Sequence, residues 1–189
     1  PPGVLNVVQG GGSTVGARLV ADPRIARVSF TGSVSTARLI AQAAGANLVP
    51  CSLELGGKSP FIVLEDADID AAAATGALMY RNAGQVCLAG TRFLVHRSIS
   101  DRFVASMRAV VEQLRVGDPQ DESTEVGPII HPRQVERVLG YIDRAVAGGA
   151  KLLWGGGRHP FGAQYLQPTM LAGVEQSDEI VQNEVFGPV

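Results

Sequence analysis

Cys87 is the side chain with the greatest capacity for covalent chemistry, and it lies in the small-residue segment NAGQVCLAG. Gly84 and Gly90 leave room for a substrate to reach the sulfur, whereas a structural cysteine usually has bulky apolar neighbours. Cys51, inside an apolar run, fits that structural role better. Because a thiolate is a strong nucleophile and a good leaving group, the sequence favours Cys87 as a nucleophile, with a buried thiol as the alternative.

Two glutamates are candidates for proton transfer or binding. Glu54 lies at the end of an apolar run in LELGGK, where it stands between leucines and is followed by two glycines. Desolvation at such a position favours the protonated acid and suits it to proton transfer. A surface glutamate at a strand end is the alternative. Glu184, in NEVFGPV, carries no further signal of its own.

Two glycine-containing segments stand where α/β proteins often bind a nucleotide phosphate. The loop GGGSTVG, residues 10–16, follows a predicted strand and opens a helix, although its glycines are spaced one residue wider than GxGxxG in the second gap. Gly32 and Ser33 precede another predicted helix, whose free amide groups attract an anion. A plain turn and a simple helix cap at Ser33 are the respective alternatives.

No histidine supports the cysteine locally. His96, His131 and His159 are far apart in the sequence, so a cysteine–histidine hydrolase stays open only as a distant alternative. No histidine–carboxylate spacing indicates a zinc site either. The sequence therefore predicts a site without a metal ion.

Residues 1–55 show alternating strands and helices. Apolar patterning predicts strands over residues 4–8 and 26–30, each followed by a loop and a helix. The second helix is expected to follow Ser33 and to end at Gly45. This order is typical of part of a parallel sheet flanked by helices.

Residues 56–189 do not continue this regular strand–helix alternation, and the change begins at the loop-forming sequence ELGGKSP. Asp68 is placed to cap a helix, an amphipathic helix follows Ser100, and Pro132 opens another. The predicted strands cover 61–64, 91–96 and 170–174. Both amphipathic helices are expected to pack on a shared core.

Composition excludes several classes of protein. The 189 residues carry 16 basic and 18 acidic side chains, a net charge of −2, which argues against nucleic-acid binding driven by positive charge. Hydrophobic residues make up 46% of the chain, enough for a core, but no stretch approaches the roughly 20 apolar residues of a bilayer span. No secretory signal is visible. Two cysteines without CxxC spacing indicate reduced thiols and a cytoplasmic location.

Four motifs together make these separate signals specific. FTGS, LELGGKSP, GQVCLAGTR and EVFGPV occur in this order, separated by segments of suitable length. In this they resemble the aldehyde dehydrogenase superfamily, over the whole chain. The resemblance implies an α/β fold, with residues 1–55 as the C-terminal part of a Rossmann-type dinucleotide-binding domain and residues 56–189 as an incomplete α/β catalytic domain.

The resemblance also implies a reaction and a role for individual residues. Cys87 matches the family nucleophile and Glu54 its general base. The positions that match cofactor-binding residues are Gly10, Gly32, Ser33, Leu55, Glu184 and Phe186. The implied reaction oxidises an aldehyde to a carboxylic acid with NAD or NADP, through a thiohemiacetal and a thioester of the cysteine.

Family members are longer than this chain, so the resemblance implies an internal fragment with little or no activity by itself. The full-length protein is then expected to form homo-oligomers, and the partner of the site is a small-molecule aldehyde, with neither nucleic acid nor membrane involved. The alternative function is that of a non-catalytic truncated subunit, which binds nucleotide or a partner chain.

Overall fold

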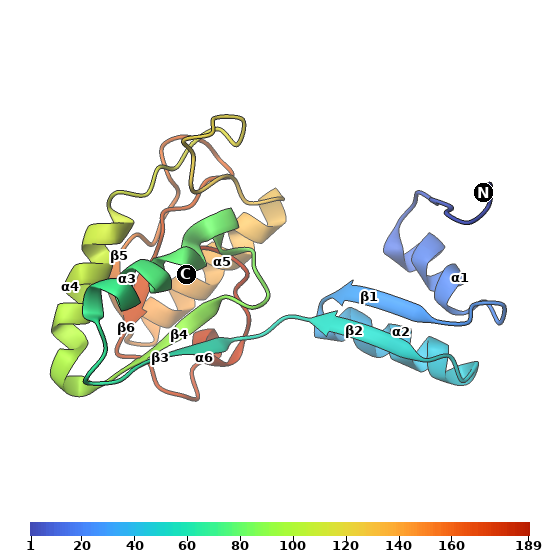
Figure 1. Ribbon diagram of the computed structural model, residues 1–189, viewed down its shortest axis with the longest axis horizontal. Helices are drawn as coiled ribbons and strands as arrows, with labels where there is room; N and C mark the ends of the chain where they lie inside the picture. Colours follow the sequence, from blue (N-terminus) through green and yellow to red (C-terminus); the bar gives the residue numbers. More distant parts are fainter. The chain divides into compact units, whose positions relative to one another are not determined.

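The computed structural model describes residues 1–189, which divide into two compact units, Pro1–Gly56 and Gly57–Val189 (Figure 1). Unit 1 holds one two-stranded parallel sheet. Unit 2 holds a second parallel pair and one antiparallel pair, together with the longer helices. The mixed α/β architecture agrees with the fold class that the sequence predicts.

Unit 1 is built on a strand–helix–strand arrangement. Its elements are the π-helix η1 (Gly12–Gly16), α1 (Ala17–Val20), β1 (Val28–Gly32), α2 (Val34–Ala46) and β2 (Cys51–Leu55). β1 and β2 are parallel, which is the predicted kind of sheet although its second strand was not predicted, and α2 connects them. The side chain of Ser33 accepts a hydrogen bond from the amide of Thr36 and so caps α2, while Ala37 and Ala44 supply its buried face. The helix start is therefore set by a local polar contact.

Two predictions for this unit are wrong. Residues 4–8 form no strand and their apolar side chains are exposed, because no neighbouring strand takes up their backbone hydrogen bonds. The glycine segment is not a loop throughout, because the amide of Val15 bonds to the carbonyl of Gly11 and the chain turns into η1 and α1. Two bounds also shift: β1 begins at Val28, and α2 continues through Gly45 to Ala46.

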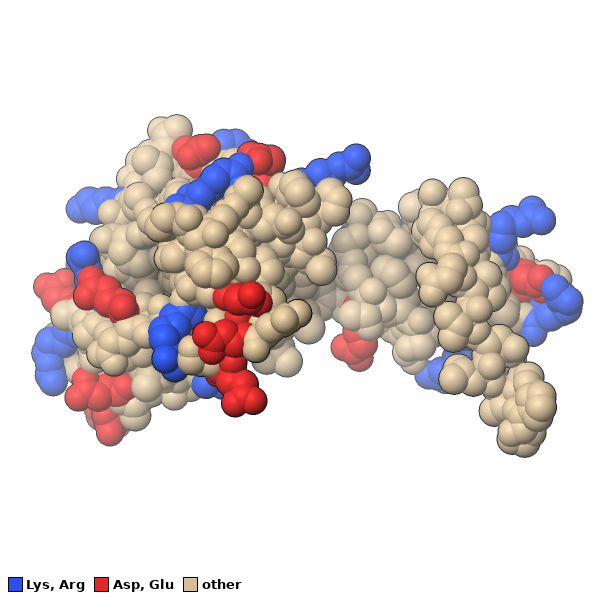
Figure 2. Space-filling model, turned by 90° about the horizontal axis from the view of Figure 1, so that it is seen from above, with Lys and Arg blue, Asp and Glu red and all other residues tan.

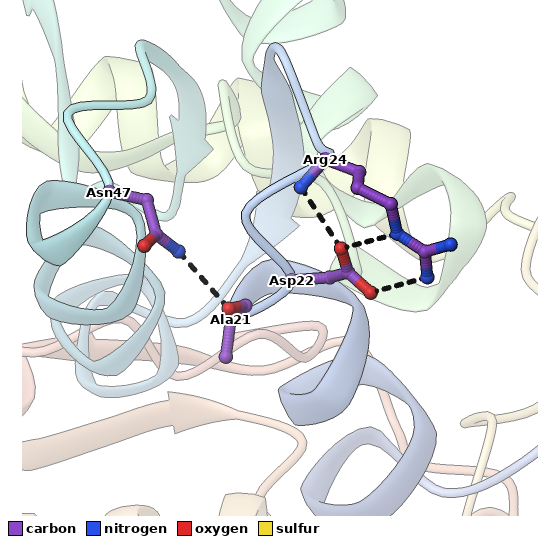
Figure 3. A network of polar contacts seen from close by, with 4 residues as sticks. All are labelled: Ala21, Asp22, Arg24 and Asn47. Carbon is purple, nitrogen blue, oxygen red and sulfur yellow. Dashed lines mark hydrogen bonds and ion pairs between the residues drawn. The ribbon is translucent and has the colours of Figure 1, made fainter.

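Side-chain contacts hold the turn that leads from α1 towards β1 (Figure 3). The Asp22 carboxylate accepts hydrogen bonds from Nε and Nη2 of Arg24, at 2.9 and 2.8 Å, and this contact holds the pKa of Asp22 well below its usual range. Nδ2 of Asn47, just after α2, donates to the carbonyl of Ala21 at 3.0 Å. The ends of both helices are thereby tied together.

Unit 2 contains the larger core. Its elements are β3 (Ser59–Val63), α3 (Ile69–Ala77), the 3₁₀ helix η2 (Leu78–Gly84), β4 (Gly90–Val95), the 3₁₀ helix η3 (Arg97–Ile99), α4 (Ser100–Val111), α5 (Pro132–Ala147), β5 (Lys151–Trp154), β6 (Met170–Ala172) and α6 (Glu179–Gln182). β3 pairs in parallel with β4, and β5 pairs antiparallel with β6.

Helices α3 and α4 cover one face of the β3–β4 pair. The ring of Phe93 lies 5.3 Å from that of Phe61 and 5.7 Å from that of Phe103 on α4. Met107 on α4 is fully buried, and the backbone of Gly76 on α3 approaches Phe93 closely. This aromatic cluster orients β4, the strand that follows the turn containing Cys87.

The helix boundaries of unit 2 follow the predicted signals. Asp68 caps α3 through the amide of Ala71, Pro132 is at the first turn of α5, and Gly148 ends α5. Tyr80 lies in η2, just after α3, and is buried. The buried face of α5 carries Val135, Val138, Tyr141 and Ile142, whereas Val146 is 42% exposed.

Candidate active site

Cys87 lies in an exposed turn between η2 and β4. The turn is closed by a hydrogen bond from the amide of Ala89 to the carbonyl of Val86, and Ala89 is buried while Cys87 and Leu88 face outwards. The sequence prediction of an accessible thiol at Cys87 therefore agrees with its placement. Cys51 is half-buried, and its sulfur lies 3.9 Å from the carbonyl of Val49.

The backbone just before the nucleophile candidate is unusual. Asn82, Ala83 and Gly84 all have positive φ angles, of 52°, 53° and 68°. Such angles are costly for residues with a side chain and persist only where surrounding contacts enforce them. A Cβ at Gly84 would collide with the carbonyl group of Gly187, so this position requires glycine. The Cys87 loop and the loop of Glu184 are thus in direct backbone contact.

The Glu184 loop, residues 183–188, follows α6 and is held by α5. Nε2 of Gln134 donates to the carbonyls of both Val185 and Phe186, at 2.9 Å each, and Nη2 of Arg137 donates to the carbonyl of Glu184 at 3.0 Å. Phe186 has a φ of 57°, a strained value for an aromatic residue. The helix therefore fixes this loop through its backbone and leaves the side chain of Glu184 for other contacts.

The carboxylate of Glu184 has a free acceptor. Its Oε1 is buried and has no hydrogen-bond partner in the protein. A buried acceptor without a partner costs free energy unless a ligand or water satisfies it. Lys58 is the nearby cation that acts on it electrostatically, although no ion pair joins the two side chains. This atom is suited to accept hydrogen bonds from the hydroxyl groups of a ligand.

Lys58 is half-buried, and its burial lowers its pKa to about 8. The guanidinium of Arg92 lowers the pKa further, whereas the negative charge of Glu184 opposes the shift. Nε of Arg92 also donates to the carbonyl of Lys58 at 2.6 Å. The segment that carries Lys58 is therefore hydrogen-bonded to β4, the strand that follows the turn with Cys87.

Four of the predicted site residues meet at the carboxyl ends of β1 and β2. The strand register sets Glu54 beside Thr31 and Leu55 beside Gly32, and Ser33 follows directly as the cap of α2. In α/β proteins ligands bind at this edge of a parallel sheet. The hydroxyl of Ser33 is occupied by contacts with Thr36, so the helix-cap interpretation applies to its side chain.

Glu54 is exposed in unit 1, so the desolvation expected from its leucine neighbours is not provided there. The reason is that Leu53 and Leu55 both lie on the face of the strand opposite to Glu54 and so do not enclose its carboxylate. Gly10 is also exposed and lies just before η1. Cys87, Glu184 and Phe186 belong to unit 2, whereas the other predicted site residues belong to unit 1.

Sequence patterns did not indicate the residues that hold these loops. The side chains that hold the loops belong to Gln85, Gln134 and Arg137, and they bind backbone carbonyl and amide groups of other residues. Every residue offers such a backbone carbonyl, so a single sequence gives no pattern that identifies the partners. Lys58 is part of LELGGKSP, but its burial depends on Arg92, on another strand. No group of three or more His, Cys, Asp and Glu side chains is arranged to hold a metal ion.

Comparison with known proteins places this geometry in a family. The sequence model of the Aldehyde dehydrogenase family matches residues 1–189. A curated protein of Staphylococcus saprophyticus named "Putative aldehyde dehydrogenase" is 45% identical over 193 residues, which cover 100% of this chain and 41% of that protein. The chain belongs to the aldehyde dehydrogenase family, and the resemblance stated from the sequence is confirmed.

Solved structures agree with this assignment. The crystal structure of an NAD-dependent aldehyde dehydrogenase from Sinorhizobium meliloti has a TM-score of 0.96 and 40% identity, and the match covers 100% of this chain and 38% of that one. An NADP-dependent enzyme of E. coli has a TM-score of 0.95 and 38% identity, with 100% and 39% coverage. The chain spans about 40% of the length of the relatives that it matches.

The surface gives two further observations. Basic and acidic side chains lie among one another on the face shown in Figure 2, with large uncharged areas between them. None of the helices is long and apolar enough to cross a bilayer.

Proposed function

We propose that this chain is the central part of an enzyme that oxidises an aldehyde to a carboxylic acid with NAD or NADP. The observation that carries the proposal is the family match over residues 1–189, combined with an exposed Cys87 whose loop contacts the loop of Glu184. In this proposal residues 1–55 belong to the dinucleotide-binding domain and residues 56–189 to the catalytic domain.

The chemistry of the site rests on Cys87 and Glu54. The thiolate of Cys87 adds to the carbonyl carbon of the aldehyde, and the new C–S bond gives a thiohemiacetal. When bound, the nicotinamide cofactor accepts the hydride that leaves this carbon, so the aldehyde is oxidised and the cofactor is reduced. Glu54 then takes a proton from the water that attacks the resulting thioester. The C–S bond breaks, the carboxylic acid leaves and the thiolate is restored.

Residues of both units are proposed to hold the cofactor. The amide groups at the start of α2, at Gly32 and Ser33, suit the pyrophosphate because a helix N-terminus carries partial positive charge. The unpartnered Oε1 of Glu184 suits ribose hydroxyl groups. Gly10, Leu55 and Phe186 are proposed to complete the contacts. Both an NAD-dependent and an NADP-dependent enzyme are among the similar structures, so the proposal covers both cofactors.

A cysteine variant tests the function. In the enzyme built to the length of its relatives, Cys87→Ser should lower aldehyde-dependent formation of reduced cofactor by several orders of magnitude, because the hydroxyl is a far weaker nucleophile. The half-buried Cys51 provides the matched control, and Cys51→Ser should leave the rate nearly unchanged. Retained turnover in Cys87→Ser would contradict the assignment of the nucleophile.

A non-catalytic role is the second candidate, because the strand ends and the start of α2 in unit 1 suit nucleotide binding without any contribution from Cys87. In that case the chain binds nucleotide or a partner chain without turnover. An aldehyde oxidation assay with NAD and NADP, run on the 189-residue chain and on the longer enzyme, separates the two. We expect little or no turnover in the chain by itself and clear turnover in the longer enzyme, and turnover in neither would favour the non-catalytic role.

A further inference from the structure

The Cys87 loop, residues 82–90, contains two hydrogen bonds between Asn82 and Gln85, a few residues before the cysteine. Nδ2 of Asn82 donates to the carbonyl of Gln85 at 3.0 Å, and Nε2 of Gln85 donates back to the carbonyl of Asn82 at 3.0 Å. These reciprocal bonds span the positive-φ residues Ala83 and Gly84. They therefore supply part of the free energy that keeps this strained backbone in place.

The same carboxamide of Gln85 also reaches a segment far away in the sequence. Its Oε1 accepts a hydrogen bond from the amide of Ile130 at 2.9 Å, and its Nε2 lies 3.3 Å from the carbonyl of Pro128. Both the donor and the acceptor capacity of one side chain are thus used on backbone groups. Such contacts depend on where the backbone lies and do not depend on which side chains that segment carries.

The segment that Gln85 holds is the start of α5. His131 is the cap of this helix, and its first turns carry Gln134 and Arg137, which hold the Glu184 loop. Hydrogen bonds thus join the Cys87 loop to residues 128–130 and join the first turns of α5 to the Glu184 loop, and the backbone of residues 130–137 connects the two sets. The two loops also touch directly at Gly84 and Gly187.

We propose that Gln85 is a positioning residue, whose carboxamide fixes the Cys87 loop to the start of α5 and thereby to the loop of Glu184. The inference rests on the proposed function, in which Cys87 is the nucleophile and Glu184 contacts the cofactor. Gln85 itself touches neither substrate nor cofactor in this role. It sets where the sulfur stands relative to a helix that also fixes the cofactor-binding loop.

Amide hydrogen exchange on the 189-residue chain tests the physical part. Gln85→Met keeps the length of the side chain but removes its hydrogen bonds, so exchange of residues 83–90 should become about tenfold faster or more. The matched control is Gln164→Met. Gln164 binds the same segment, through Nε2 to the carbonyl of Ile129 at 2.8 Å, and makes no hydrogen bond to residues 82–90. The control should leave exchange of residues 83–90 near the wild-type rate.

Single-turnover kinetics in the longer enzyme test the functional part. Gln85→Met should slow formation of reduced cofactor about 10- to 100-fold, because a small displacement of a reacting group is enough to cost this much. The KM for NAD should change little, and Gln164→Met should retain the wild-type rate. A loss in both variants, or a loss in neither, overturns the positioning role. Turnover retained in Cys87→Ser would instead refute the proposed function, while the exchange experiment still reports on the loop.

A second variant guards against loss of folding. Gln85→Glu keeps the size and one acceptor, but its ionised carboxylate faces the carbonyls of Asn82 and Pro128 without a proton to donate. Protonation restores one donor, so the rate relative to wild type at the same pH should rise as the pH falls from 8 to 5.5. A ratio that stays constant, or that falls, across this range contradicts the proposal.

Discussion

At the scale of single residues, the site depends on which polar atoms are exposed and which are buried without partners. The thiol of Cys87 is exposed, that of Cys51 is half-buried, and Oε1 of Glu184 is buried without a protein donor. The ammonium group of Lys58, whose charge acts on Glu184, is itself partly shielded from water. Each of these states gives a measurable consequence.

The two cysteines should differ in reactivity. With a limiting amount of iodoacetamide, Cys87 should be alkylated before Cys51, because the reagent reaches an exposed sulfur more readily and Cys51 lies in β2. Peptide mapping by mass spectrometry gives the order of modification. Earlier modification of Cys51 in the folded protein would refute the assignment.

Glu54 should act mainly after hydride transfer. In the longer enzyme, Glu54→Gln is expected to give a rapid burst of reduced cofactor followed by slow steady-state turnover, because hydrolysis of the thioester lacks its base. Stopped-flow absorbance resolves both phases. If the burst slows to the same extent as turnover, Glu54 instead serves to activate the cysteine.

Lys58 should make stability depend on pH. Its pKa is about 8 in the folded protein and returns towards 10.5 on unfolding, so the unfolded chain binds more protons between these values. The free energy of unfolding should therefore rise from pH 8 to 10.5, by up to about 3 kcal/mol. Lys58→Met should remove this rise, whereas Lys151→Met, which replaces an exposed lysine, should keep it. Urea unfolding followed by the fluorescence of Trp154 measures both.

At the scale of elements, α5 organises the loops of unit 2. One end of the helix adjoins the segment bound by Gln85, its first turns bind the Glu184 loop, and Arg144 near its end pairs with Glu179 of α6. Arg144 and Arg137 also stack on the ring of Tyr141, at 5.1 and 5.5 Å. A single helix thus fixes the approach of two loops that are far apart in the sequence.

The contact between those loops should tolerate no side chain. Gly84→Ala is expected to lower the free energy of unfolding by more than about 2 kcal/mol, because Gly84 has a φ of 68° and an added Cβ would collide with the Gly187 carbonyl. Gly140→Ala, inside α5, meets only the end of the flexible Arg144 side chain and should instead stabilise by about 0.5–1 kcal/mol. Equal effects in both variants would contradict this packing.

At the scale of the molecule, the uncovered face of the β3–β4 pair is the feature with a consequence for behaviour in solution. Ile62 and Leu94 lie opposite one another in the register, on the face away from Phe61 and Phe93, and are 63% and 49% exposed. An apolar face next to unpaired strand edges favours association between chains.

The 189-residue chain is therefore expected to associate as its concentration rises. Ile62→Lys should shift light scattering coupled to size-exclusion chromatography towards the monomer mass, because a charge on this face opposes its burial. Ile130→Lys is the control, since Ile130 is 79% exposed but lies outside the strands. The same mass distribution in both variants would show that the face is not used.

The sequence by itself determined the family, the α/β class and the starts of the main helices. The helix starts at Ser33, Asp68 and Pro132 depend on residues only a few positions apart, so a local pattern is enough to find them. Four short motifs in a fixed order carried the family, and they contain Cys87 and Glu54 as the candidates for catalysis.

Only the tertiary structure decided which contacts hold the loops of Cys87 and Glu184, and which apolar segments are buried. Residues 4–8 have the apolar, Val-rich composition of a strand, but a strand needs a neighbour for its backbone hydrogen bonds, and composition alone does not supply one. Gln85 binds residues 128 and 130, and Gln134 binds residues 185 and 186. These contacts join side chains to backbone groups at long sequence separation, so they arise from the fold and have no local signature in the sequence.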